Sequence, residues 1–308
     1  MLEQSLPCAV ALTACPSHDA TAVSRAVGQV LDASRWTPPR GRVLVKPNLL
    51  RAVPLACTHP AVTAAACRWL MDCGARPLVA DSPGFGTARG VAAAIGLEDA
   101  LKPLGLKVHA LDGPVPVPLR GGGSWGVSRM ALEAEAILSI PRVKAHTQVR
   151  VTLAVKNLFG CICGLGKVMA HARQGETLTC FTDGVADLLL ALPPAAGLAD
   201  GVTAMHGTGP SGGQPFPLGC IGASSSAAAL DVALCRMLGL KPETSPIWDA
   251  LCRAGVAQAL AEPTYPLRRP EEFSTEGFRL PAELAEISFR PRRLLWSVLR
   301  RCWRSWFS

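Results

Sequence analysis

The sequence lacks the signatures of several common protein classes. No apolar run in its 308 residues reaches the length of a transmembrane helix, and residues 1–16 lack the charged-then-apolar organisation of a signal peptide. Its twelve cysteines include no C-x-x-C pair, which argues against a zinc ribbon or a self-contained ferredoxin cluster. No P-loop lysine motif occurs, and the predicted helix after Gly90 lacks G-x-G-x-x-G, which argues against a nicotinamide-binding protein. We therefore expect a cytoplasmic protein of another kind.

Charged residues are scarce, at 18% against 49% apolar residues, so disorder is not expected over most of the chain. The net charge of +8 owes six positive charges to arginines after residue 289, where there is no acid. Basicity confined to a tail argues against nucleic-acid binding. We predict an α/β domain over residues 1–288, either undivided or with two lobes that divide near residues 113–135, and a basic amphipathic helix over residues 289–308. That helix would dock on a ferredoxin-like partner, on a membrane surface or on its own domain.

Apolar runs alternate with helical patterns along the chain. The predicted strands are residues 9–14, 42–45, 77–80, 107–111, 136–140 and 218–223, and the main predicted helices are residues 19–34, 60–73, 176–192 and 227–238. This alternation predicts an α/β fold with a mostly parallel sheet covered by helices on both faces. Residues 113–128 are rich in glycine and proline, which predicts a hairpin or a small excursion from the sheet.

Polar side chains follow three of the predicted strands. Lys46 and Asn48 come after the second strand, Asp81 after the third, and Lys144 and His146 after the strand that ends before Pro141. Ligands of such sheets bind at the carboxyl ends of the strands. We therefore predict that these side chains form one site.

The stretch 137–167 supplies most of the expected chemistry, because cations, an amide and clustered glycines suit an anionic ligand. The predicted catalytic residues are His146, which would transfer protons, and Lys144 and Lys156, which would hold negative charge. The predicted substrate-binding residues are Lys46, Asn48, Asp81, Ser82, Asn157, Gly207 and Gly209. The plainer alternatives are a basic surface loop, a histidine satisfied by a backbone carbonyl, and turns built by Asp, Ser and Gly.

Several further residues carry expectations. Cys161 and Cys163 form a C-x-C pair that could contribute to a metal or iron–sulfur site, although such a site needs three or four ligands. Asp231 lies in an apolar helical stretch, so we expect its carboxylate to be paired or hydrogen-bonded. Thr58 is expected to cap the helix that begins at Pro60, and the alternative is that His59 caps this helix or acts as a ligand.

Seven short motifs occur in order along the chain. They are K-P-N (Lys46–Asn48), T-H-P (Thr58–Pro60), D-S-P-G (Asp81–Gly84), K-x-H-x(5)-T-x(3)-K-N-x-x-G (Lys144–Gly160), D-G-V (Asp200–Val202), G-x-G-P (Gly207–Pro210) and A-L-D (Ala229–Asp231). Together they resemble the domain-of-unknown-function family 362. The resemblance implies a cytoplasmic protein and an association with iron–sulfur proteins. Members often carry a C-terminal ferredoxin-like module with two four-iron clusters, which this sequence lacks.

The sequence therefore predicts two alternative functions. The first is an enzyme that binds a small carboxylate or phosphate in a Lys/His site. The alternative is an iron–sulfur or metal-linked redox or cofactor-handling accessory protein that docks a ferredoxin-like partner. A third reading, in which the Lys/His site holds an organic or nickel cofactor, rests on a loose similarity of motif style to the nickel-pincer racemases.

Overall fold

The computed structural model describes residues 8–164 and 178–285. Its strands are β1 (Val10–Ala14), β2 (Arg42–Pro47), β3 (Arg76–Asp81), β4 (His109–Ala110), β5 (Pro114–Pro118), β6 (Ser124–Ser128), β7 (Ala136–Ile140), β8 (Arg142–His146), β9 (Arg150–Thr152), β10 (Ala195–His206), β11 (Gln214–Phe216) and β12 (Cys220–Ser224). Its α-helices are α1 (Ala20–Ala33), α2 (Pro60–Asp72), α3 (Ala88–Ala94), α4 (Leu97–Leu101), α5 (Arg129–Leu132), α6 (Ala154–Leu158), α8 (Leu178–Ala191), α9 (Ala227–Met237), α10 (Pro246–Arg253) and α11 (Ala257–Leu260). Two short 3-10 helices, η1 (Pro54–Ala56) and η3 (Phe159–Cys161), lie near the site described below.

A single large sheet organises the described residues. Its strand order is β1-β12-β10-β7-β2-β3-β4, with β8 and β11 also paired to β10 and β9 paired to β8. The pairs from β10 through β7, β2 and β3 to β4 are parallel, and β1, β9, β11 and β12 pair antiparallel. The carboxyl ends of β2, β3 and β7 therefore lie at one edge of the sheet.

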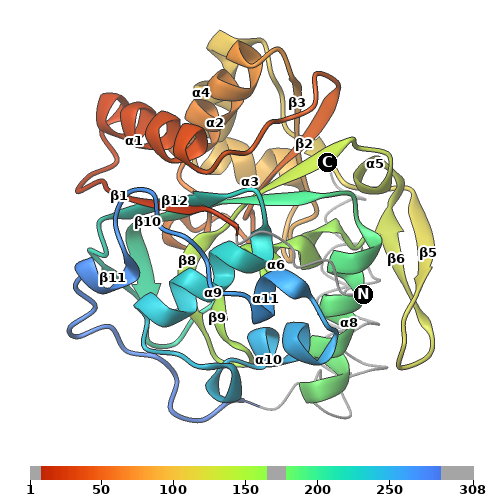
Figure 1. Cartoon of the computed structure of the whole chain (residues 1–308). Coiled ribbons are helices and arrows are strands. Elements are labelled where there is room, and N and C mark those ends of the chain that lie inside the picture. Colours follow the sequence, from red (N-terminus) through yellow and green to blue (C-terminus); the bar gives the residue numbers. More distant parts are fainter. Residues whose placement is uncertain (1–7, 165–177, 286–308) are drawn as a thin grey trace.

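Helices cover both faces of this sheet (Figure 1). Helices α1, α2, α3 and α4 pack on one face, and their apolar side chains form a core cluster with alternate residues of β2 and β3. On the opposite face, α6, α8, α9 and α10 enclose a second core cluster. The predicted α/β class is thus confirmed. None of the described helices combines the length and the apolar character that a membrane span requires.

Two segments depart from the sheet in ways that concern the site. The glycine- and proline-rich stretch forms the separate antiparallel hairpin of β5 and β6. Pro141, which has no N–H to donate, separates β7 from β8, and β8 then pairs further along β10. Residues 142–146 were predicted to follow the end of a strand, but they form a strand of their own. The reason is that β10, which was not among the predicted strands, is twelve residues long and pairs with both β7 and β8.

Candidate functional site

Lys46 and Asp81, at the carboxyl ends of β2 and β3, form a buried ion pair. The distance from Lys46 Nζ to Asp81 Oδ1 is 2.7 Å, and both side chains are almost completely inaccessible to solvent. Lys46 Nζ also donates to the carbonyl of Pro47 at 3.0 Å. The Asp81 carboxylate accepts the backbone N–H groups of Leu49 and Ser82, each at 2.7 Å. A buried pair is tolerated when its remaining hydrogen bonds are made in this way.

Asn157 joins this pair to the loop that follows β2. Its Oδ1 accepts from Lys46 Nζ at 3.3 Å and from Asn48 Nδ2 at 3.1 Å. Its Nδ2 donates to the Lys46 carbonyl at 3.0 Å and to Ser139 Oγ at 3.1 Å. All four hydrogen-bonding positions of the amide are used, so its orientation is fixed.

Gly160, in η3, lies against the ion pair. A Cβ at this position would overlap Lys46 Cε and Nζ and lie 2.5 Å from Asp81 Oδ1. The K-N-x-x-G spacing therefore supplies an amide that binds the pair and a glycine that makes room for it.

Lys144, on β8, is the second buried lysine, and it differs from Lys46 in its partners. Its Nζ donates to Asn48 Oδ1 at 2.6 Å and to the Ala56 carbonyl at 2.7 Å. Both acceptors are neutral, and no carboxylate of the described residues lies within ion-pair distance of Nζ. Burial lowers the pKa of Lys144 to about 7, with Cys57 opposing and Arg142 adding to this effect. At neutral pH the amine is therefore present both protonated and unprotonated.

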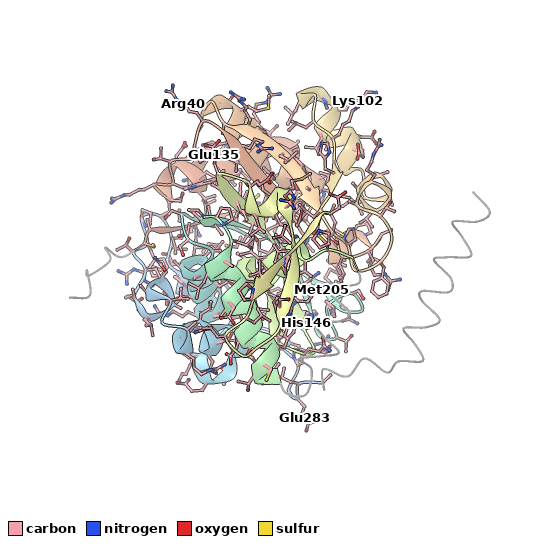
Figure 2. The ribbon with its side chains drawn as sticks, turned by 90° about the vertical axis from the view of Figure 1, so that its right-hand side faces the viewer. Arg40, Lys102, Glu135, His146, Met205 and Glu283 are labelled. Carbon is pink, nitrogen blue, oxygen red and sulfur yellow. The ribbon has the colours of Figure 1, made fainter. Side chains whose placement is uncertain are left out.

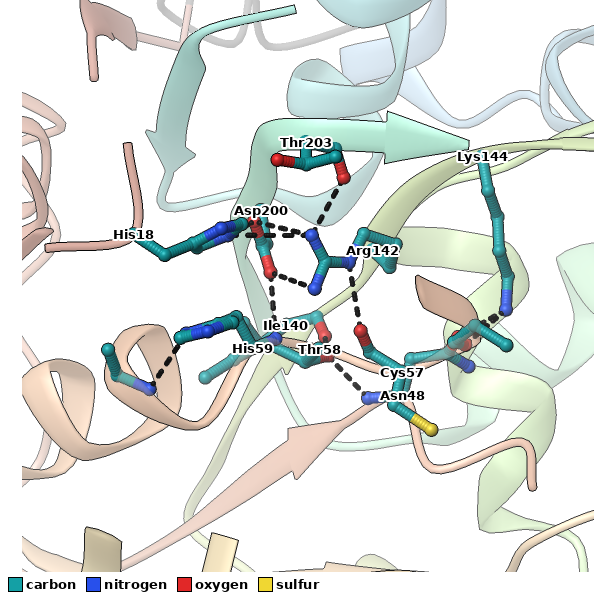
Figure 3. A network of polar contacts seen from close by, with 12 residues as sticks. His18, Asn48, Cys57, Thr58, His59, Ile140, Arg142, Lys144, Asp200 and Thr203 are labelled. Carbon is teal, nitrogen blue, oxygen red and sulfur yellow. Dashed lines mark hydrogen bonds and ion pairs between the residues drawn. The ribbon is translucent and has the colours of Figure 1, made fainter. Parts of the chain in front are cut away.

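A second polar network adjoins Lys144 (Figure 3). Arg142 forms a buried ion pair with Asp200, with 3.3 Å between Nη2 and Oδ2, and donates to the Thr203 carbonyl at 2.7 Å. Burial alone would raise the pKa of Asp200, but Arg142 and His18 hold this pKa below its usual value. Asp200 also accepts from the His59 backbone at 2.8 Å and contacts His18 Nε2 at 3.0 Å.

The two histidines stack with 3.9 Å between ring centroids. Burial and the neighbouring His18 lower the pKa of His59 to about 4, so this ring is neutral at physiological pH. His59 also caps α2, because its Nδ1 accepts the Ala61 N–H at 3.3 Å. Thr58, the cap predicted from the sequence, instead donates to the Ile140 carbonyl and accepts the Asn48 N–H at 2.8 Å. The prediction for Thr58 was wrong because its hydroxyl lies between two strands.

The turn 56–58 connects the two networks. The Ala56 carbonyl accepts from Lys144, and the Cys57 carbonyl accepts from Arg142 Nε at 2.8 Å. Two buried cations on one strand thus hold adjacent carbonyls of the same turn (Figure 3).

The remaining predicted residues lie around this cluster. His146 is two residues beyond Lys144 on β8, and its Nδ1 accepts the Gln148 N–H at 3.1 Å. Gly209 packs directly on the Ala145 carbonyl of β8, where a Cβ would collide with that oxygen, and its own carbonyl accepts the Thr147 N–H. Gly207 has a φ of 79°, a conformation that favours glycine. The roles predicted for these residues and for Ser82 stay predictions.

Lys156 points away from its neighbour Asn157. Its Nζ lies 4.4 Å from the ring centroid of Phe159 and 5.2 Å from that of Phe181. It lines a small cavity together with Asp231 and Trp248. The structure therefore does not place Lys156 with Lys46 and Lys144, since successive residues of a helix are rotated by about 100°.

Asp231 satisfies its buried carboxylate as expected. Its two oxygens accept the Ala154 and Val155 N–H groups, at 2.7 and 3.0 Å, at the start of α6. Burial raises the pKa of Asp231 to about 8, against the opposing effect of these two hydrogen bonds. The helix that carries Asn157 is thus fixed at its amino end by α9.

Cys161 and Cys163 are both buried. Within residues 8–164 and 178–285, no group of three or more His, Cys, Asp or Glu side chains is arranged to hold a metal ion. Metal binding by these two cysteines stays a prediction. The predicted helix 289–308 lies outside the described residues.

The predicted site residues did not include His18, Ser139, Arg142 or Asp200. The available signals were the D-G-V motif and the lone cation that directly follows Pro141. Neither signal identifies a buried ion pair, because its two members are far apart in the sequence.

Comparison with known proteins shows similarity to a protein family, to a curated relative and to a solved structure. The family described as Domain of unknown function (DUF362) matches residues 43–236. The thylakoid-associated protein sll1697 of Synechocystis sp. (strain ATCC 27184 / PCC 6803 / Kazusa) is 35% identical over 277 residues, which cover 86% of this chain and 84% of that protein. The lactate racemase apoprotein of Thermoanaerobacterium thermosaccharolyticum matches with a TM-score of 0.48 and 14% identity, over 76% of this chain and 58% of that one. The extent of the family match shows that the chain belongs to the DUF362 family.

Proposed function

We propose that this protein is an enzyme that binds a small anionic molecule, a carboxylate or a phosphate, beside Lys144. The single observation that carries the proposal is the charge balance of the buried cations. Lys46 is paired with Asp81 and Arg142 with Asp200, whereas Lys144 has only neutral acceptors among the described residues. An anion placed at Lys144 would supply the missing counter-charge.

The chemistry proposed for Lys144 is proton transfer to or from the bound molecule. A group serves best as a general acid or base when its pKa lies near the working pH. The pKa of Lys144, about 7, meets that requirement, and His146 lies on the same face of β8 as a second proton-transfer group. Asn48 would position the amine, because it accepts from Lys144 and is itself held by Asn157.

The alternative of an iron–sulfur or cofactor-handling accessory protein with a ferredoxin-like partner stays a prediction. The cytoplasmic location also stays a prediction. The relative from Synechocystis is named for its association with thylakoids.

The test is calorimetric titration of the full chain with acetate and with inorganic phosphate. Lys144→Met should weaken binding of the accepted anion at least about ten-fold, because it removes a charge-assisted hydrogen bond from a buried site. The control is Lys102→Met, which removes the same charge from an exposed position far from His146 (Figure 2). The affinity of Lys102→Met for the anion should stay within about a factor of two of the wild-type affinity. Equal affinities of the wild type and Lys144→Met would refute the proposal.

A further inference from the structure

The hairpin of β8 and β9 places two more polar residues on the face that carries Lys144. In the antiparallel register, Lys144 is opposite Thr152 and His146 is opposite Arg150. Directly opposed residues project from the same face of a sheet, with Cβ atoms about 4.5–5.5 Å apart. The intervening Val151 contributes to the apolar core on the other face.

Thr152 is buried with an unused hydroxyl. Only 4% of the residue is exposed, and Oγ1 has no hydrogen-bond partner among the described residues. A buried hydroxyl without a partner is unfavourable, and most buried polar groups in proteins are satisfied. A hydroxyl kept beside a buried amine at such a cost points to a ligand that both groups contact.

Arg150, two residues before Thr152 on β9, has an N–H group that makes no hydrogen bond within the described residues. Its Nη1 donates to the Pro281 carbonyl at 2.9 Å, but its buried Nε has no partner among the described residues. No carboxylate of the described residues forms an ion pair with this guanidinium. Arg150 also has a φ of 69°, which is uncommon outside glycine.

The charges indicate which anion fits. When Lys144 is protonated, it and Arg150 provide two cationic groups without described counter-ions, so a monoanion such as acetate would leave one positive charge unbalanced. A phosphoryl group carries about −1.5 to −2 charge near neutral pH and presents three acceptor oxygens. These match an ammonium, a hydroxyl and a guanidinium N–H in number and in kind.

We infer that the anion site extends from Lys144 over β9 and takes the dianionic phosphate group of a free phosphate or a phosphomonoester, with Thr152 and Arg150 as specificity residues. This inference rests on the proposed function and narrows its substrate class. Thr152 Oγ1 hydrogen-bonds a phosphate oxygen, and Arg150 Nε donates to another.

The test compares two threonines that both have unpartnered, buried hydroxyls. Thr152→Val and Thr63→Val, the latter in α2, each remove such a hydroxyl at nearly constant volume. Both variants should melt at or above the temperature of the wild type, because each loses an unsatisfied polar group. Calorimetric titration at pH 7.5 then uses inorganic phosphate, glycerol 3-phosphate and acetate as probes.

Thr152→Val should bind the phosphate probes about ten-fold or more weakly, and Thr63→Val as tightly as the wild type. Whichever of inorganic phosphate and glycerol 3-phosphate binds more tightly identifies the source of the phosphoryl group. Unchanged phosphate affinity in Thr152→Val would overturn the inference. Binding of acetate through Lys144 without any phosphate binding would overturn it as well, while leaving the proposed function intact. Absence of binding by all three probes would overturn both.

Discussion

Gly160→Ala is expected to disrupt the buried ion pair of Lys46 and Asp81. The added methyl group would occupy the space of Lys46 Cε and Nζ, and neither side chain can move into water because both are buried. Separating a buried pair typically costs about 3–5 kcal/mol, since each charge loses its partner without regaining solvent. Total stabilities of domains are about 5–15 kcal/mol, so this loss is a large fraction of the whole.

Urea unfolding followed by tryptophan fluorescence measures this free energy of unfolding. The control is Gly28→Ala in α1, where nothing lies within 4 Å of the added Cβ. That variant should be up to about 1 kcal/mol more stable, because alanine favours a helix more than glycine does. The reasoning about the crowded position would be refuted if Gly160→Ala were as stable as the wild type.

A double variant separates steric disruption from other effects of the methyl group. Lys46→Ala shortens the side chain that Gly160→Ala would displace. In the Lys46→Ala background the glycine substitution should therefore cost about 0.5–3 kcal/mol less than in the wild type, because only the close contact with Asp81 Oδ1 remains. If the unfolding free energies lost in the two single variants simply add in the double variant, the methyl group does not act through the Lys46 side chain.

Three further outcomes follow from the buried titratable groups. The pKa of Lys144 is about 7 in the folded protein and about 10.4 in the unfolded chain. The unfolded chain therefore holds more protons between pH 7 and 10, so the unfolding free energy of the wild type should rise with pH there, by at most about 1.4 kcal/mol per pH unit. Lys144→Met should lose that rise in urea titrations at several pH values. The pKa of Asp231 is about 8 folded against about 3.9 unfolded, so its contribution to stability is present below pH 4 and is lost as pH rises to 8. Asp231→Asn should show a smaller decline between pH 5 and 8, and an unaltered decline would contradict the assigned pKa. Anion binding at pH 8 should take up about 0.8 proton if it raises the pKa of Lys144 to about 9, which calorimetry in two buffers of different ionisation enthalpy can measure.

The sequence predicted the location of the cluster because parallel strands end at one edge of a sheet. Lys46, Asn48, Asp81 and Lys144 were expected to meet there, and the structure brings them together with Asn157. The prediction rested on local patterns, namely an apolar strand followed by polar residues.

The burial of the cations could not be predicted in the same way. Residues 142–146 alternate charged and small apolar residues, which in a sequence resembles a half-exposed segment. Their polar face is buried because Asp200 and the turn 56–58 cover it, and neither contact is local in sequence. Lys156 was assigned to the cluster from its position beside Asn157, but only the packing of α6 determines which of the two faces Lys46.

The turn 56–58 gives the two buried networks a common support. Lys144 holds one of its carbonyls and Arg142 holds the next, while the Thr58 hydroxyl binds the end of β7. A ligand that draws the ammonium of Lys144 away from Ala56 would release one attachment of a segment that leads directly into the stacked histidines. Ligand binding beside β8 would then change the position of His59, which caps α2 and follows Ala56 closely along the backbone, without any hinge between domains.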